Sequence, residues 1–257
     1  MVDTLLEVND LGIQFGGLAA LERVAFGMEP GEIVGLIGPN GAGKTTVFNL
    51  ITGIYPPTSG WISLDGKRLA GMGTRRIFQQ GVARTFQNIR LFKKMSALDN
   101  ARVAAHNQMT YNPLTGALRL PGYWREEADV TKRAMAMLEI FGLSEYARET
   151  ASSLPYGRQR RLEIARALMS GPKLLLLDEP AAGMNPTETQ SLMSTIRDVR
   201  DRFGVAILLI EHDMRLVMGI CERLVVLDYG QVIARGAPGE IRRDERVVKA
   251  YLGGSAV

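Results

Sequence analysis

The amino-acid sequence predicts an α/β protein whose core is a mostly parallel sheet, formed by two sequence segments with a helical subdomain between them. Strand and helix patterns alternate after residue 170, which is typical of βαβ units. Strand and hairpin patterns fill the first 87 residues, and helical patterns dominate the stretch between these two parts. We therefore expect residues 1–87 to form the first part of the core, 88–169 the helical subdomain, and 170–257 the second part of the core with a C-terminal tail.

The first core segment contains strands, a helix and a hairpin. LLEVNDLGIQF and ERVAFGMEPGEIVGLIG predict strands broken by turn residues, and GKTTVFNLITG predicts a helix that ends at Gly53. GWISLDGKRL predicts a hairpin, because the pair Asp65–Gly66 suits a two-residue turn. GVARTFQ predicts another short strand at the end of this segment.

The middle segment is mainly helical, and the last one returns to alternation. SALDNARVAAH predicts a helix opened by a capping box at Ser96 and Asp99, and YWREEADVTKRAMAMLEIFG predicts a second helix. Between them, NQMTYNPLTGALRLPG is rich in turn formers and predicts a loop or insertion. Strands and helices then alternate through KLLLLD, NPTETQSLMSTIRDVRDRF, VAILLIEHD, MRLVMGICERLVVLD and QVIARG.

Composition limits the classes of function. With 257 residues, 46% of them hydrophobic and 23% charged, the chain has the size and balance of one soluble α/β domain with an inserted subdomain. A net charge of +4 suits an anionic ligand or a membrane surface and is too weak to indicate nucleic acid. Cys221 is the single cysteine, which excludes an internal disulfide. The N-terminus does not resemble a signal peptide, and no apolar run approaches the roughly 18 residues of a membrane span.

The strongest motif is GPNGAGKTT, which matches a phosphate-binding loop between an apolar strand and a helix. Glycines let successive backbone N–H groups face an anion at the start of the helix. Lys44 adds a positive charge for the β- and γ-phosphates, and the Thr45 hydroxyl is a hard oxygen suited to Mg²⁺. A purely structural glycine turn is the weak alternative. The expected ATP contacts are Gly38, Pro39, Asn40, Gly41, Ala42, Gly43, Lys44, Thr45 and Thr46.

Two further strand ends carry candidate catalytic side chains. In KLLLLDEP, Asp178 comes where a strand ends, which is where ligands bind in open α/β sheets, and it is the expected Mg²⁺ partner of Thr45. Glu179 follows and can polarise a water molecule against the γ-phosphate. In LLIEHDM, His212 follows another strand and can reach the same side as a hydrogen-bond donor. By itself, His212 is more simply interpreted as a partly buried polar group.

These motifs, together with Gln87 in ARTFQ and the stretch LPYGRQRR, occur in the order seen in ATP-binding cassette (ABC) ATPases, and the chain resembles that family over nearly its whole length. Within the family, FGGLAAL, TFQNIRLF, YGRQRRLEIARALM, DEPAAGMNP, LIEHDMRLVMGI and VVKAYLG are similar to the ATPase subunit of bacterial branched-chain amino acid importers. The resemblance implies a P-loop ATPase core with an N-terminal antiparallel β subdomain and an inserted α-helical subdomain, using ATP and Mg²⁺.

The resemblance also implies roles for single residues. Phe15 would stack on adenine, and Gln87 would contact Mg²⁺ and the attacking water while coupling the helical subdomain to the core. Asn185 stands where the family's dimer-contact loop usually has Asp. Leu91 and Phe92 fall where such proteins form a groove for the membrane partner. The alternative for Phe15 and Phe92 is ordinary core packing.

The signature stretch departs from the family's usual Leu-Ser-Gly-Gly-Gln. Here it reads Leu154, Pro155, Tyr156, Gly157 and Arg158. Pro155 removes a hydroxyl and a backbone N–H, although proline is tolerated in the first turn of a helix. We interpret the stretch as a functional but altered contact to the ATP bound by another cassette.

The resemblance implies a set of partners and a location. Two cassettes, identical or paralogous, would sandwich ATP, and integral membrane permease subunits would receive the motion. An external solute-binding protein would act only indirectly, and the chain would lie at the cytoplasmic face of the inner membrane. A soluble ATPase acting on nucleic acid or ribosomes is an alternative, but such proteins typically carry two cassettes or a long coiled coil, and we expect no nucleic acid partner here. A non-enzymatic regulator is another alternative, disfavoured because Lys44 and Glu179 are present. The sequence leaves the solute open among amino acids, amides, urea and lipids.

Overall fold

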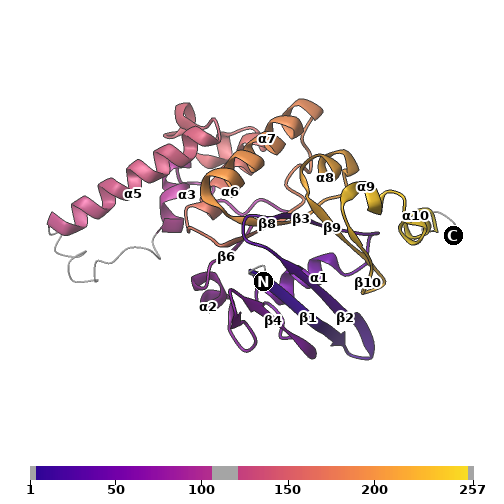
Figure 1. Cartoon of the computed structure of the whole chain (residues 1–257). Helices are drawn as coiled ribbons and strands as arrows, with labels where there is room; N and C mark the ends of the chain where they lie inside the picture. Colours follow the sequence, from indigo (N-terminus) through magenta and orange to yellow (C-terminus); the bar gives the residue numbers. More distant parts are fainter. Residues whose placement is uncertain (1–3, 106–120, 254–257) are drawn as a thin grey trace.

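The protein contains two β-sheets with helices between and above them (Figure 1). A computed structural model describes residues 4–105 and 121–253. The smaller sheet is antiparallel, with strand order β2-β1-β4-β5. The larger sheet has the order β10-β9-β3-β8-β7-β6, and all its strands run parallel except β10, which is antiparallel to β9.

The elements follow the predicted alternation. The strands are β1 (Leu6–Phe15), β2 (Leu18–Met28), β3 (Ile33–Ile37), β4 (Ser59–Leu64), β5 (Lys67–Arg68), β6 (Val82–Arg84), β7 (Leu174–Asp178), β8 (Ala206–Ile210), β9 (Arg223–Asp228) and β10 (Gln231–Gly236). The α-helices are α1 (Lys44–Ile51), α2 (Thr74–Gln79), α3 (Ala97–Ala104), α5 (Pro121–Ile140), α6 (Tyr156–Leu168), α7 (Pro186–Phe203), α8 (Met214–Ile220), α9 (Pro238–Ile241) and α10 (Glu245–Gly253). Short 3₁₀ turns cover Ser144–Tyr146 and Ala151–Ser153.

The larger sheet separates two hydrophobic cores. Strands β3, β7 and β8 are buried along their whole length, as expected for parallel strands covered on both faces. Alternate residues of β7 divide between the cores: Leu174 and Leu176 join the smaller sheet and α1, whereas Leu175 and Leu177 join the helices. Figure 1 shows the antiparallel sheet on one side and α6, α7 and α8 on the other.

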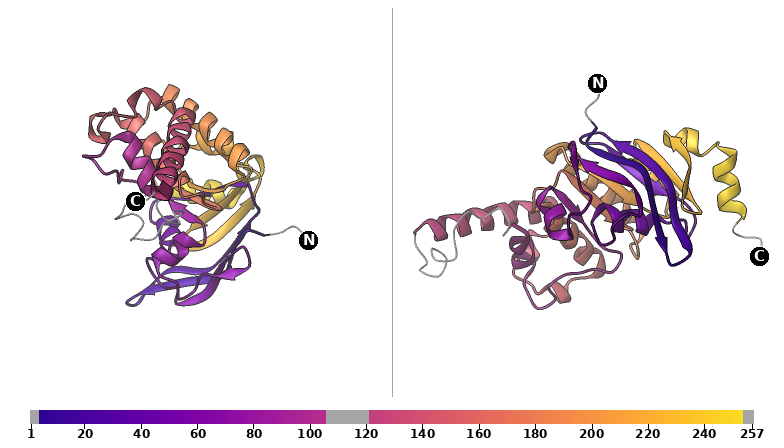
Figure 2. Two further views of the ribbon diagram at one scale, coloured as in Figure 1. Left: turned by 90° about the vertical axis from the view of Figure 1, so that its left-hand side faces the viewer. Right: turned by 90° about the horizontal axis from the view of Figure 1, so that it is seen from below.

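Helices α3, α5 and α6 pack against one another and extend the helical side of the molecule. Figure 2 shows α5 projecting at one end and α10 lying at the opposite end. This helical grouping agrees in character with the predicted subdomain, and the boundaries at residues 88 and 169 stay predictions. Residues 88–95, which the sequence assigned to the helical part, form no helix, and α3 begins only at Ala97.

Of the local predictions, the helix end at Gly53 and the turn at Asp65–Gly66 are confirmed, and the capping box at Ser96 is not fully formed. Gly53 has the left-handed backbone of a helix C′ residue, and Asp65 and Gly66 both have positive φ in the β4–β5 turn, so these two predictions are confirmed. The capping box at Ser96 is only half formed. The Ser96 hydroxyl accepts a hydrogen bond from the Asp99 backbone N–H at 3.0 Å. The Asp99 carboxylate accepts a hydrogen bond from the same hydroxyl and does not reach the backbone N–H of Ser96. The predicted loop at 107–122 lies almost wholly outside the described residues.

Candidate active site

A sharp loop joins the C-terminal end of strand β3, inside the larger sheet, to α1. Gly38 and Gly43 bound it, with φ of 148° and 102°, values that L side chains rarely adopt. A Cβ atom at Gly38 would lie 2.0 Å from the carbonyl oxygen of Leu227, so only glycine fits there. Within the described residues, no side chain caps the first turn of α1. Its N–H groups are therefore available to an anion, and all the predicted phosphate contacts from residue 38 to 46 lie in this loop and turn.

Lys44 is folded into the loop that precedes it. Its side chain is largely buried, and Nζ donates hydrogen bonds of 2.8 Å to the carbonyl oxygens of Gly38 and Pro39. Burial lowers the pKa of the ammonium group, whereas the nearby Glu179 and Asp178 raise it. Two of the three ammonium donors are thus satisfied inside the loop, which holds the positive charge where phosphate is expected.

Asp178 ends strand β7 and is buried beside a partner that the sequence analysis missed. Its Oδ2 forms an ion pair with Arg84 at 2.8 Å, and the other nitrogen of that guanidinium donates to Asn49 on α1. Arg84 also lies against the rings of Phe48 and Phe86. It ends strand β6, next to β7, so strand pairing brings it to Asp178. Only one carboxylate oxygen is occupied by this pair, and Oδ1 remains as a hard ligand.

Glu179 lies between Gln87 and His212. Gln87 Nε2 donates to Glu179 Oε2 at 2.9 Å, and His212 Nε2 lies 2.8 Å from Oε1. Because a carboxylate only accepts, Nε2 carries the hydrogen in this contact. Glu179 has φ of 48°, uncommon for a residue with a side chain and frequent at functional sites. The three predicted catalytic residues therefore meet beyond the C-terminal ends of β7 and β8, although they come from three separate segments.

A second carboxylate that the sequence analysis missed supports this arrangement. Glu211 is buried at the end of β8 and accepts the backbone N–H groups of Ala181, at 2.9 Å, and His212, at 3.1 Å. Burial raises the pKa of Glu211, and the backbone hydrogen bonds oppose that rise. It ties the turn after Glu179 to the turn that carries His212. The motif LLIEHDM contained it, but an acidic residue beside a histidine has no distinctive spacing.

The signature stretch forms the exposed start of helix α6. Pro155 is the N-cap residue, and Tyr156 is the first helical residue with 45% of its surface exposed. The guanidinium of Arg158 lies 3.9 Å from the centre of the Tyr146 ring. A Cβ atom at Gly157 would lie 3.0 Å from Glu188 Oε1, at the end of a flexible side chain. Pro155, Tyr156, Gly157 and Arg158 are thus placed together at one helix end, as predicted.

Comparison with known proteins decides the family. The ABC transporter family matches residues 21–182, and the branched-chain amino acid ATP-binding cassette transporter family matches residues 231–257. The chain is 49% identical over 249 residues to the high-affinity branched-chain amino acid transport ATP-binding protein BraF of Pseudomonas aeruginosa, covering 97% of this chain and 98% of the relative. It is also 49% identical to LivG of Escherichia coli K12, covering 98% and 99% of the two chains. The chain belongs to the ABC transporter ATPase family.

Solved structures of ABC ATPases confirm the predicted fold class. An ATP-binding cassette of an ABC transporter in its ADP conformation superposes with a TM-score of 0.84 at 30% identity, covering 97% of this chain and 99% of that one. The chain is therefore an ABC ATPase by sequence and by fold. None of the helices described, including the long α5, is long and apolar enough to span a bilayer.

Two aromatic side chains that the ABC resemblance singled out are exposed, so neither is in a core-packing environment. Phe15 is 45% exposed at the end of β1 and makes an edge contact with Tyr55, the ring centres being 5.2 Å apart. Phe92 is 49% exposed and lies beside the guanidinium of Arg166. Leu91 differs from Phe92, because it packs against the hydrophobic core.

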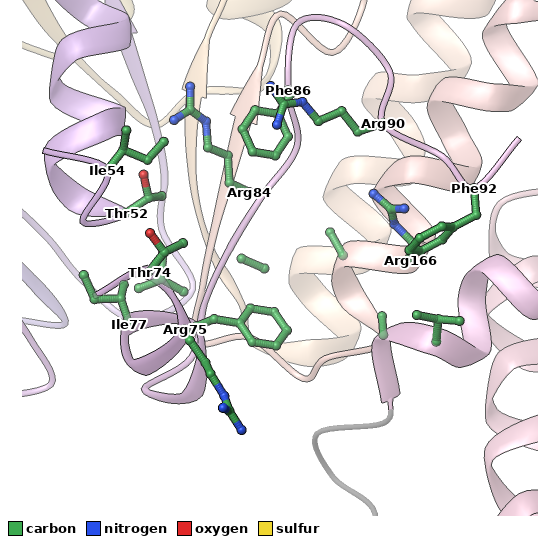
Figure 3. Close-up of a pocket in the computed structure, with 16 residues that line it drawn as sticks. Thr52, Ile54, Thr74, Arg75, Ile77, Arg84, Phe86, Arg90, Phe92 and Arg166 are labelled. Atoms are coloured by element: carbon green, nitrogen blue, oxygen red, sulfur yellow. The ribbon is translucent and has the colours of Figure 1, made fainter. Parts of the chain in front are cut away.

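A groove of about 620 Å³ lies between the core of this ABC ATPase and its helical part (Figure 3). Phe92 and Arg166 border it on the helical side, and Arg84 and Phe86 on the side of strand β6. The predicted groove residue Phe92 therefore lines a real depression, whereas Leu91 does not.

Proposed function

We propose that this ABC ATPase powers a membrane importer and that its solute is a branched-chain amino acid. The position of Glu179, held by Gln87 and His212 beside the phosphate loop, supports the hydrolytic part. BraF and LivG, near-full-length relatives at 49% identity that are named as branched-chain amino acid transport ATP-binding proteins, support the transport part and its solute. The match of residues 231–257 to the branched-chain amino acid transporter family adds a second, C-terminal argument.

ATP binding would use the loop from Gly38 to Thr46. The phosphates would accept hydrogen bonds from the first turn of α1, and Lys44 would exchange its carbonyl partners for phosphate oxygens. Phe15, exposed at the end of β1, would stack on the adenine.

The residues near the phosphate loop fit a magnesium ion bound together with nucleotide. Thr45, Asp178 and Gln87 offer hydroxyl, carboxylate and amide oxygens, which are the hard ligands that Mg²⁺ prefers. Among the described residues there is no cluster of three or more His, Cys, Asp or Glu that could hold a metal ion. A bound Mg²⁺ would neutralise charge on the phosphates.

Hydrolysis would depend on Glu179. The Glu179 carboxylate would orient and polarise the attacking water. His212, whose Nε2 hydrogen is donated to Glu179 Oε1 in the chain without nucleotide, would turn that donor toward the γ-phosphate when ATP binds. A second cassette, identical or paralogous, would cover the nucleotide with its own signature stretch, the counterpart of Pro155–Arg158. Permease subunits would enter the groove beside Phe92 at the cytoplasmic face of the membrane, and an external solute-binding protein would act through them.

The test separates hydrolysis from solute. The purified wild-type chain should hydrolyse MgATP, and the matched variant Glu179→Gln should bind ATP without turnover. Deletion of the gene in the organism that carries it should reduce uptake of labelled leucine, isoleucine and valine and leave uptake of labelled urea unchanged. Restoring the wild-type gene, but not Glu179→Gln, should restore uptake. Hydrolysis with unchanged uptake of all three amino acids would reject the solute, and absence of hydrolysis would reject the ATPase role.

A further inference from the structure

Helix α6 carries a buried ion pair that the site described above does not use. Arg160 and Glu163 lie three residues apart on one face of the helix, and the guanidinium donates to Glu163 Oε2 at 2.9 Å. The two side chains are 0% and 1% exposed. Burial of two charges is unfavourable unless further hydrogen bonds accompany the pair, so the partners of these side chains show what the pair does.

Apart from the Tyr156 hydroxyl, which lies 3.4 Å from the guanidinium, those partners are backbone groups of a single segment. Arg160 donates to the carbonyl oxygens of Phe86, at 2.5 Å, and Gln87, at 2.6 Å, and Glu163 Oε1 accepts the backbone N–H of Arg90 at 2.9 Å. The segment 86–90 lies outside the helices and strands. Its conformation is therefore set largely by two side chains of α6.

The same segment carries the amide that contacts Glu179. Arg160 holds the backbone carbonyl of Gln87, and the side chain of that residue donates to Glu179 Oε2 at 2.9 Å. A guanidinium is a planar fork that binds two oxygens in fixed directions, which a lysine ammonium on a flexible stem does not reproduce. A displacement of α6 therefore displaces Gln87 relative to Glu179.

We propose that Arg160, held by Glu163, is a positioning residue for ATP hydrolysis. It acts through Gln87 and makes the geometry at Glu179 depend on the placement of α6, whose first residues are the signature stretch. This inference rests on the proposed function, because it takes Gln87 and Glu179 as parts of the hydrolytic site. The helix whose first residues would meet the other cassette is thereby joined to the Glu179 carboxylate through Arg160 and Gln87.

Arg160→Lys tests the proposal in the full-length chain. It keeps the charge and removes the fork, so we expect kcat for MgATP to fall about 10- to 100-fold, as misplacement of a reacting group does, with KM and equilibrium ATP affinity within about twofold of wild type. Arg161→Lys, the same change at the adjacent, half-buried residue, is the matched control and should change neither value. A kcat within about twofold of wild type for Arg160→Lys would overturn the proposal.

A double-mutant cycle separates positioning from general stabilisation. If Arg160 acts through Gln87, the variant that combines Arg160→Lys with Gln87→Ala should be no slower than Gln87→Ala alone. Losses that multiply would show that Arg160 acts elsewhere and would also overturn the proposal.

Hydrogen exchange and a second variant test the proposal if turnover cannot be measured or Arg160→Lys does not fold. Hydrogen exchange of the peptide 86–92 should speed up in Arg160→Lys and stay unchanged in Arg161→Lys, and this measurement needs no turnover. If Arg160→Lys does not fold, Glu163→Gln is the second variant, because its amide oxygen keeps an acceptor for the Arg90 N–H. Glu163→Gln should lower kcat and retain ATP affinity. An unchanged kcat in Glu163→Gln would contradict the proposal. A wild-type chain without ATPase activity would instead contradict the proposed function.

Discussion

The phosphate loop and the start of helix α6 belong to the same chain but differ in how complete they are. Around the phosphate loop, the functional side chains have partners within the chain: Lys44 with loop carbonyls, Asp178 with Arg84, and Glu179 with Gln87 and His212. At the start of α6, Pro155 and Tyr156 face solvent, and the N-cap residue offers no side-chain hydrogen bond. The first region is organised by its own fold, whereas the second has a surface suited to an external partner.

This difference predicts different sensitivities to substitution. Changes around the phosphate loop should alter chemistry or nucleotide affinity in the isolated chain, because the interactions exist within it. Changes at the start of α6 should alter association between cassettes. The following predictions test that contrast in order of decreasing expected effect.

Glu179→Gln should lower turnover by about 100-fold or more, because only the water-polarising carboxylate is removed. The amide retains the size of the side chain and one oxygen, so ATP affinity should remain within about twofold of wild type. Steady-state phosphate release and equilibrium binding of a fluorescent nucleotide measure the two quantities. Turnover within about tenfold of wild type would remove Glu179 from this role.

Lys44→Ala should weaken ATP binding by about 10- to 100-fold, because it deletes a charge-assisted hydrogen bond to phosphate. The exposed Lys67 in the smaller sheet provides the matched control, since Lys67→Ala removes the same charge far from the loop in sequence. Titration calorimetry with MgATP measures both variants. Equal affinity of Lys44→Ala and wild type would contradict the assignment.

Pro155→Ser in a Glu179→Gln background should strengthen ATP-dependent association of cassettes by about tenfold. A restored hydroxyl can add a hydrogen bond to phosphate worth about 1.5–3 kcal/mol. Loss of the proline ring lowers the free energy of unfolding by about 0.4–1 kcal/mol and does not enter the association of folded chains. Sedimentation velocity with MgATP, with the same partner cassette in each run, measures the change.

Pro155→Ala is the control for this variant, because it removes the ring without adding a hydroxyl. It should associate no better than the parent. Equal or weaker association of Pro155→Ser would show that the helix start is already arranged around proline. Gain in both variants would assign the effect to the backbone N–H instead of the hydroxyl.

The smallest expected effect is on the rate at which a thiol reagent labels the chain. Cys221 is buried, and burial raises its pKa to about 12, so the native thiol should not react with a thiol reagent at neutral pH. Tyr156→Cys in a Glu179→Gln background then adds one exposed thiol at the start of α6. Its labelling should be fast in the free chain and slower with MgATP if a second cassette covers that surface. Labelling that ignores MgATP would contradict the composite site.

Local motifs were predictable from the sequence, and contacts between distant charges were not. The loop from Gly38 to Thr46 follows from consecutive residues, because a glycine-rich turn before a helix needs no tertiary information. Asp178 and Glu179 were placed at the sheet edge because an apolar run such as LLLLD signals a buried strand. His212 was placed on the same side because it follows another apolar strand, whereas the role of Gln87 rested on the family resemblance.

Arg160 and Glu163 show why the rest was missed. An Arg and a Glu three residues apart on a helix usually form an exposed pair, and their sequence context, RRLEIAR, resembles a solvated face. Only the packing of segment 86–90 over α6 makes them buried. The full capping box predicted at Ser96 and Asp99 does not form for a more local reason. The Asp99 carboxylate accepts a hydrogen bond from the Ser96 hydroxyl and does not reach the backbone N–H of Ser96.

The hydrogen bonds from Lys44 to its own loop bear on the rate at which one nucleotide replaces another. Because the ammonium group has two carbonyl acceptors of its own, departure of ADP leaves no unpaired buried cation behind. The same two bonds would hold the lysine at the loop until phosphate oxygens compete for its donors. ATP binding would then replace one pair of oxygen acceptors of Lys44 with another, and ATP and ADP would compete for the same ammonium donors.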